Sequence, residues 1–464
     1  MLASAYATGR SFLDRKITGQ SFSVGLCYVL LLGVCMGWLL SLGKVSFLLT
    51  LVVITIAAVG SSETCCRLLF VCFPFFNVMG ADLGGTSMFY LLILLYILKA
   101  TIDGSVAHVR ERYVALMLVF VFTVYNIGAG LTYAKWLIHL TVPLFVLGTD
   151  RLKENFPTYV RFLTISLMIS GFMGLMMMDR GIYLYTFGTV NTGVDVTTRF
   201  SGLVGDAVVF GQVVSLVVGT NAYLMYAGKA YRGAFPITLV LVFFAFLTYS
   251  KGALICLGIV GVLALFGFVR KATRDGLPVR YFIGGLLALA AAYLLATYML
   301  TGSSLFSADA LATRLDSSDL LTARRDIWNA YFKLWDSTGL PMLFKGIGFD
   351  TYLNTTVYGR WHNCHNLYIE AVTLFGWVMA VVMVMILVGH FMKMKRKEVP
   401  FFAFLPSILL LVSGLILHGF LDFPFFYEWT VALGCLEFAA AGAGKRRIKK
   451  KKEADSAYTG FIKP

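Results

Sequence analysis

The sequence predicts an all-α polytopic membrane protein that crosses a bilayer with about 12 to 14 helices. Of its 464 residues, 59% are hydrophobic and 14% are charged, whereas soluble domains contain about a quarter charged residues. The hydrophobic residues are grouped into runs close to the roughly 20 residues that a membrane-spanning helix needs. No low-complexity segment divides the chain before its basic C-terminus, so we expect a single integral membrane domain over residues 1–464.

The apolar runs follow one another along the chain, separated mostly by short polar connections. The first run is too long for the hydrophobic segment of a signal peptide and no small-residue cleavage site follows it, so we expect a retained helix. Most cysteines lie inside or beside these runs, which favours small buried side chains over a disulfide framework. The candidate spans are 22–42, 45–60, 67–79, 86–100, 113–130, 131–148, 159–178, 206–226, 237–250, 253–269, 281–300, 367–390, 401–419 and 428–444.

Basic residues predict how these helices are oriented. The net charge of +15 is concentrated in connections between spans and in the tail 445–464, which begins KRRIKKKK. This is the positive-inside pattern, so the charge does not indicate nucleic acid, and we place both termini in the cytoplasm. The tail is expected to anchor the chain at the anionic inner leaflet. The basic connections are 104–112, 150–161, 227–232, 270–280 and 391–397.

With the basic connections and both termini in the cytoplasm, two longer segments, 179–205 and 301–366, lie on the outer side of the membrane. The second is the one large extracytoplasmic loop, and it carries acidic and basic residues in equal number. Within it, residues 318–335 (SDLLTARRDIWNAYFKLW) have apolar residues near helical spacing, which predicts an amphipathic helix on the outer membrane surface. Residues 339–350 (GLPMLFKGIGFD) are predicted to form a turn.

Positive side chains recur at the predicted outer ends of spans: Arg199, Lys251 and the pair Arg324 and Arg325. Placing one such charge at the middle of a membrane helix costs roughly 2.5 to 3.5 kcal/mol. Each of them alone is explained by snorkelling or by an ion pair. Together, from separate parts of the chain and on one side, they favour a shared anionic ligand. Because the arginine fork fits phosphate oxygens, a lipid diphosphate is the expected ligand.

The stretch RWHNCHNLYIEAVTLFGW (360–377) leaves three interpretations open: a metal site, a nucleophilic cysteine and a general base. The spacing of His362, Cys364 and His365 is not a standard zinc pattern, and no metal is expected. A nucleophilic Cys364 needs an oriented base, for which adjacency in sequence is weak support. We interpret Cys364 and His362 as polar loop residues. His365 precedes a helix-forming run, and an imidazole, with an ordinary pKa near 6.5, suits a general base.

Several stretches resemble, in order and spacing, the O-antigen ligase and O-antigen polymerase family. They are ARRDIW, KGIGFDTY and HNLYIEAVTLFGW, together with TTRFSGLVGDAVVFGQ and TYSKGALI, within about residues 199–390. The resemblance implies a GT-C-like, membrane-embedded glycosyltransferase of the bacterial inner membrane. Such enzymes use undecaprenyl-diphosphate-linked glycans at the outer face, without nucleotide sugar, cofactor or metal. The acceptor would be the lipid A core for a ligase, or a lipid-linked repeat unit for a polymerase.

The resemblance also implies roles for individual residues. His365 would activate the acceptor hydroxyl, and Arg199 and Arg324 would bind the diphosphate. Lys251 stands where the family has arginine, which leaves its role in doubt. The remaining predicted site residues are Arg325, at the diphosphate, and the supporting residues Asn366, Trp328 and Gly376. Displacement in line would invert the anomeric centre.

Two choices stay open at the level of the sequence. Within the family, nothing separates a ligase from a polymerase. Outside it, a lipid-linked oligosaccharide flippase or another transporter is the main alternative, although that class usually has charges at the bilayer midplane and an internal repeat. Membrane lipids are expected partners in every case.

Overall fold

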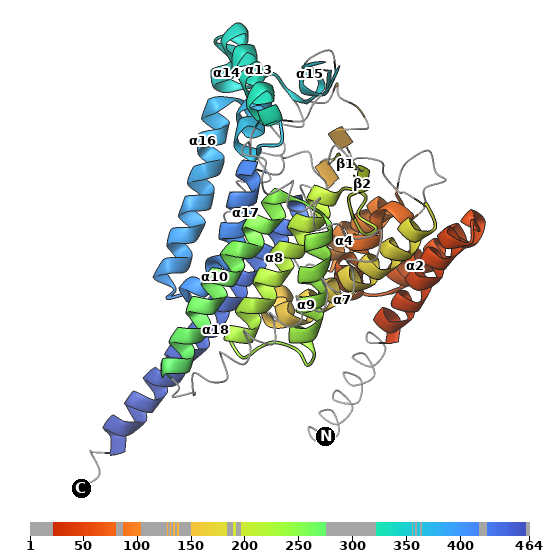
Figure 1. Ribbon diagram of the computed structural model, residues 1–464. Helices are drawn as coiled ribbons and strands as arrows, with labels where there is room; N and C mark the ends of the chain where they lie inside the picture. The colour runs from red at the N-terminus through yellow and green to blue at the C-terminus, as the bar shows by residue number, and fades with distance from the viewer. Residues whose placement is uncertain are drawn as a thin grey trace.

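The computed structural model shows a helical protein whose long helices run roughly side by side (Figure 1). It describes residues 22–79, 87–103, 128, 130, 133–134, 137–138, 150–182, 189–191, 196–274, 322–354, 356–357, 360–361, 364–416 and 425–460. The predicted spans 113–130 and 281–300, and most of 131–148, therefore lie outside the described residues.

Helices account for nearly all of the described chain. In order they are Phe22–Leu39, α2 (Gly43–Val59), α3 (Ser62–Cys72), η1 (Phe73–Val78), α4 (Phe89–Ile102), α7 (Asp150–Asp179), α8 (Ala207–Tyr226), α9 (Ala234–Leu247), α10 (Lys251–Arg274), α13 (Thr322–Thr338), α14 (Pro341–Phe344), α15 (Phe349–Asn354), α16 (Leu367–Arg396), η3 (Phe401–Phe404), α17 (Leu405–Ile416) and α18 (Phe425–Gly460).

Two short antiparallel ribbons complete the described structure. Strand β1 (Thr189–Asn191) pairs with β2 (Val196–Thr198), with Val190 opposite Thr197. Strand β3 (Thr356–Val357) pairs with β4 (Arg360–Trp361). Both ribbons fall in the segments that were predicted to lie outside the membrane.

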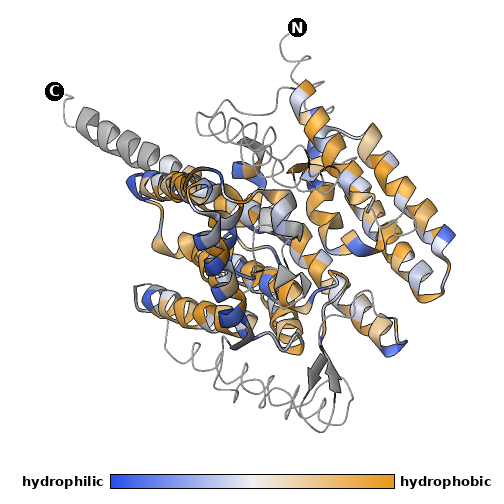
Figure 2. Cartoon of the chain, turned by 90° about the horizontal axis from the view of Figure 1, so that it is seen from above, coloured by the Kyte–Doolittle hydropathy of each residue, from blue (hydrophilic) through white to orange (hydrophobic). Residues whose placement is uncertain are grey.

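Five described helices are long and apolar enough to cross a membrane: Phe22–Leu39, Leu152–Asp179, Ala207–Tyr226, Lys251–Arg270 and Leu367–Arg396. Four shorter apolar helices, Gly43–Val59, Phe89–Ile102, Ala234–Leu247 and Phe401–Leu415, accompany them. Several of these helices carry large exposed hydrophobic side chains, which a lipid environment explains. Figure 2 shows hydrophobic residues along the helices at the edge of the molecule as well as at its centre. The prediction of a helical membrane protein is therefore confirmed, while the predicted number of spans stays a prediction.

Helix α8 lies at the centre of the bundle and packs against α9, α10 and α17. Asp206 caps its N-terminus, because its Oδ1 accepts hydrogen bonds from the backbone N–H groups of Val208 and Val209 at 2.7 and 3.0 Å. Two glycines bring neighbouring helices close. A Cβ atom at Gly211 would lie 2.8 Å from the Cβ of Ala253, and one at Gly219 would lie 2.6 Å from a methyl group of Leu409.

The predicted span 67–79 is replaced by two shorter elements. Helix α3 begins earlier, where the Ser61 side chain accepts from the backbone N–H of Thr64, and η1 follows it with Pro74 in its first turn. Arg67 is the one residue of α3 that is not buried, so this helix is packed inside protein. All eight cysteines are free and buried, as the sequence predicted for most of them.

The predicted extracytoplasmic loop, residues 301–366, contains more helix than expected. The predicted amphipathic helix is present as α13. The predicted turn at 339–350 was too simple, because it contains α14 and the start of α15. Gly339, Gly346 and Gly348 adopt positive φ angles between these elements, where glycine fits without strain. At the C-terminus, α18 continues through the basic residues to Gly460.

Candidate functional site

The candidate base His365 lies in a tightly constrained turn before α16. Its φ angle is 48°, a left-handed conformation that few residues other than glycine adopt, and its side chain is half-buried. Next to it, Asn366 is the N-cap of α16: its Oδ1 accepts from the backbone N–H groups of Tyr368 and Ile369, both at 3.0 Å. The Asn366 Nδ2 group donates to the carbonyl of Leu415 at 3.1 Å. Asn366 therefore fixes where His365 stands relative to α16 and α17.

Cys364, on the other side of His365, is fully buried. Its backbone N–H donates to the Tyr352 hydroxyl at 3.3 Å, and its thiol donates to the Asn366 carbonyl at 3.2 Å. Its own carbonyl accepts from Trp328 Nε1 at 2.8 Å. Cys364 was interpreted as a polar loop residue, and the structure shows instead that it is buried and held by three hydrogen bonds. His362, which the metal interpretation also needs, lies outside the described residues.

Two tyrosines and a glutamate surround this turn, and sequence reasoning missed them. The rings of Tyr331 and Tyr352 stack with centroids 5.6 Å apart. Burial raises the pKa of Tyr352 well above its usual value, and the nearby Glu370 carboxylate raises it further. Burial also raises the pKa of Tyr331, so both hydroxyls stay protonated. The residue that sequence reasoning could have noticed is Glu370, the one charged residue in the apolar part of α16, which the structure buries completely.

Arg324 lies on the helix that contacts the His365 turn. It belongs to the first turn of α13 and is half-buried, whereas Arg325 is exposed. Trp328 follows Arg324 by four residues and so shares its helix face, and Trp328 is bonded to the residue before His365. The structure therefore places Arg324 and Trp328 on a helix that contacts the turn of His365 and Asn366, and it leaves Arg325 exposed. That these residues form one site stays a prediction.

Arg199 and Lys251 form a second group. The Arg199 guanidinium donates through Nε to the Thr248 carbonyl at 3.0 Å, at the C-terminal end of α9, where the helix dipole favours a cation. Three residues later, Lys251 begins α10, after Tyr249 with a positive φ of 47°. Arg199 is thus bonded to the residue three positions before Lys251. That both groups of cations face one ligand stays a prediction.

Gly376, a predicted supporting residue, is a packing residue. Its φ and ψ of 81° and 167° break α16 into two parts. A Cβ atom there would lie 2.8 Å from the backbone nitrogen of Lys345 and 2.9 Å from that of Gly346. The Ile347 N–H donates to the Thr373 carbonyl at 2.9 Å across the same contact. Gly376 therefore joins α16 to the segment after α14.

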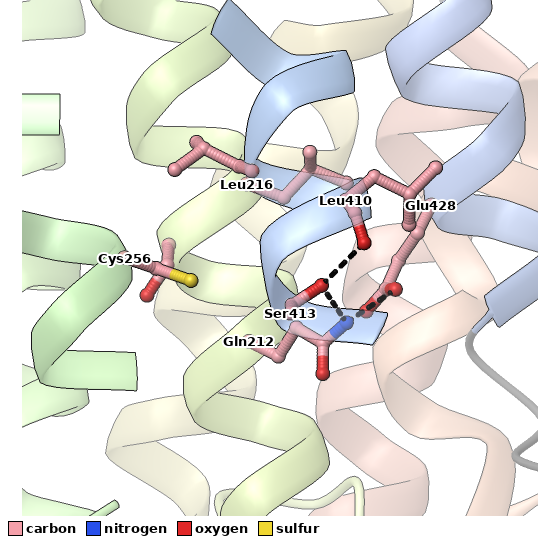
Figure 3. A pocket seen from close by; sticks show the side chains of 8 residues that line it. Gln212, Leu216, Cys256, Leu410, Ser413 and Glu428 are labelled. Carbon is pink, nitrogen blue, oxygen red and sulfur yellow. Dashed lines mark hydrogen bonds between the residues drawn. The ribbon is translucent and has the colours of Figure 1, made fainter. Parts of the chain in front are cut away.

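A buried polar cluster lies between α8, α17 and α18 (Figure 3). Gln212 Nε2 donates to Ser413 Oγ at 2.7 Å and to Glu428 Oε2 at 2.8 Å, and Ser413 Oγ donates to the Leu410 carbonyl at 2.9 Å. The space between these side chains is too small for a water molecule. The cluster holds α17 against α8 and α18. Because Leu415 of α17 accepts a hydrogen bond from Asn366, the cluster also stabilises the helix that supports the His365 turn.

The sequence was compared with models of known protein families and with curated proteins, and it matches none of them. The resemblance to the O-antigen ligase and polymerase family accordingly stays a prediction, and so do the roles that it implies.

Proposed function

We propose that the protein is an inverting, metal-independent glycosyltransferase with a GT-C-like fold. It would transfer a glycan from undecaprenyl diphosphate to a sugar hydroxyl at the outer face of the bacterial inner membrane. The observation that supports this most directly is the constrained turn at His365, bonded to the helix face that carries Arg324. An imidazole and a guanidinium on two elements that a hydrogen bond joins suit the removal of a proton together with the stabilisation of a departing phosphate.

In the proposed step, the acceptor oxygen attacks the anomeric carbon of the lipid-linked glycan. A carbon–oxygen bond forms there, and the bond from that carbon to the diphosphate oxygen breaks, leaving its electron pair on the diphosphate. His365 takes the proton of the acceptor hydroxyl. Arg324 and Arg199 compensate the charge of the diphosphate, and Lys251 adds a point charge without the bidentate arginine fork.

Two substitutions in a strain that lacks the gene test this proposal. His365→Ala is expected to lower glycan transfer by about 10²- to 10⁴-fold, the usual contribution of a positioned acid–base group. Arg324→Ala is expected to lower it as well, because the leaving diphosphate loses a charge-assisted partner. Lys333→Ala, an exposed lysine on the same helix, is the matched control. Normal surface glycan in both test variants, at wild-type protein levels, would overturn the assignment.

Gel analysis of the surface glycan in a deletion strain separates the two activities within the family, ligase and polymerase. If the protein is a polymerase, deletion leaves single repeat units on the acceptor. If it is a ligase, complete polymer accumulates on the lipid carrier.

A transporter is the second candidate, and one observation favours it. Glu428 is buried inside the helix bundle, and an ionisable group in that position is often part of a transport pathway. However, Gln212 binds both Glu428 and Ser413. These bonds join α8, α17 and α18, which is a structural role for Glu428. Turnover of lipid-linked glycan by purified protein in detergent supports the transferase, whereas movement of the lipid across vesicles without transfer supports the transporter.

A further inference from the structure

A group of large apolar side chains is exposed where α13 and α14 meet α16. Leu340 and Phe344 are 72% and 62% exposed, and Phe332, Leu343 and Trp377 are exposed as well. We call these five residues the α13–α14 patch. Large apolar surfaces of this kind mark a contact with a protein or with a membrane.

The patch is held rigidly against α16. Trp335 Nε1 donates to Thr373 Oγ1 at 2.8 Å, and the Trp335 and Trp377 rings pack edge to face, 5.4 Å apart. The close approach of Gly346 and Gly376 fixes the end of α14 at the same level. Figure 1 shows α13 and α14 over the upper end of α16. The patch therefore continues the surface of α16.

Below Trp377, this surface has the character of a lipid-facing helix. Val378, Val381, Val384, Met385, Val388 and Met392 are all exposed along it. The stripe ends at Lys393, followed by Lys395 and Arg396. The 16 helical steps from Trp377 to Lys393 rise about 24 Å, close to the roughly 30 Å of a hydrocarbon core. Trp377 then marks one membrane boundary and Lys393 the other.

We propose that the α13–α14 patch is embedded in the lipid headgroup boundary at the Trp377 end of α16. The segment would anchor the outer loop on the bilayer surface. Lipid is favoured as the occupant because the patch is continuous with a lipid-facing stripe and contains Trp377, which packs on Trp335. Tryptophan is a side chain that gathers at this depth of the membrane. The polar side of α13, with exposed Asp326 and Lys333, faces another direction around the helix. The proposal does not depend on the transferase activity.

Fluorescence quenching in nanodiscs that hold one chain each tests this placement. All eight native cysteines are buried, so a single introduced cysteine can be labelled with the fluorophore NBD. Phe344→Cys and Leu340→Cys are the test positions, and Lys333→Cys on the polar side of α13 is the matched control. Nitroxide lipids labelled at acyl carbon 5 are expected to quench the two test positions at least about threefold more than the control, and aqueous iodide should quench them less.

The other outcomes overturn the proposal. Iodide quenching at 344 and 340 equal to that at 333 would place the patch in water. Protection from both iodide and the nitroxide lipid would show that protein covers the patch. A further measurement in detergent, with labelled protein diluted over a hundredfold range, would identify a second copy if protection falls on dilution.

Discussion

At the scale of single residues, the position of His365 depends on neighbours that take no part in the proposed reaction. Its left-handed backbone is a conformation that costs a non-glycine residue about 1 to 2 kcal/mol. Cys364 and Asn366 oppose that cost through the bonds to Tyr352, Trp328 and Leu415. A strained residue that its surroundings hold in place is a common property of functional sites.

Trp328→Phe tests this positioning. The change keeps an aromatic ring but leaves the Cys364 carbonyl without its 2.8 Å donor, a loss worth about 1 kcal/mol. We expect turnover to fall while the KM for the lipid-linked donor stays near its original value, because the imidazole moves and the cations remain. Trp335→Phe, which removes a 2.8 Å bond to Thr373 at a distance along α13, is the control. Equal losses of turnover in both variants would show a structural role alone.

At the scale of elements, the backbone of α16 leaves the helical conformation at Gly376, which the continuous run of hydrophobic residues does not indicate. The run from Leu367 to Arg396 reads as one continuous helix, yet Gly376 has backbone angles that only glycine adopts readily. The break lets the N-terminal part of α16 carry the His365 turn, while the rest presents its apolar stripe. Close contact of Gly376 with Lys345 and Gly346 fixes the outer segment at the break.

Gly376→Ala is expected to lower the stability of the purified protein by about 1 to 3 kcal/mol through backbone strain, with more from the 2.8 Å contact that the new Cβ would make. Gly389→Ala on the same helix is a close control, because nothing lies within 4 Å of its added Cβ. There alanine should be neutral, or stabilising by up to about 1 kcal/mol. Thermal unfolding in detergent measures both. A Gly376 variant as stable as the Gly389 variant would contradict this account of the break.

At the scale of the whole molecule, composition and apolar runs predicted the helical membrane character, since both are summed over long windows. The predicted α13 was also present. Features decided by tertiary contact were missed: the burial of Cys364, the stacked Tyr331 and Tyr352, and the second helix α14 in a supposed turn. The helix that carries Arg324 and Trp328 contacts the turn that carries His365, whereas Gly376 has a packing role that motif spacing alone did not indicate.

The arrangement of charge over the molecule leads to a prediction of orientation. In Figure 1, α10, α16 and α18 all run toward the lower end, while α13, α14, α15 and the β1–β2 ribbon lie toward the upper end. The lower ends carry Arg270, Lys393 and the basic residues of α18. Gathering basic residues at one end of a bundle is what the positive-inside rule requires of its cytoplasmic side.

Labelling of single cysteines in intact cells tests this orientation, because the native thiols are buried. Lys345→Cys, exposed after α14, and Lys229→Cys, exposed between α8 and α9, lie toward opposite ends. A membrane-impermeant maleimide is expected to label residue 345 directly and residue 229 only after the membrane is opened. The reverse pattern would mean that the protein has the opposite orientation, with His365 on the cytoplasmic side. It would contradict the proposed reaction, which takes place at the outer face. Labelling of both residues in intact cells would mean that residue 229 is also accessible from outside. That result would contradict the predicted order in which the helices cross the membrane.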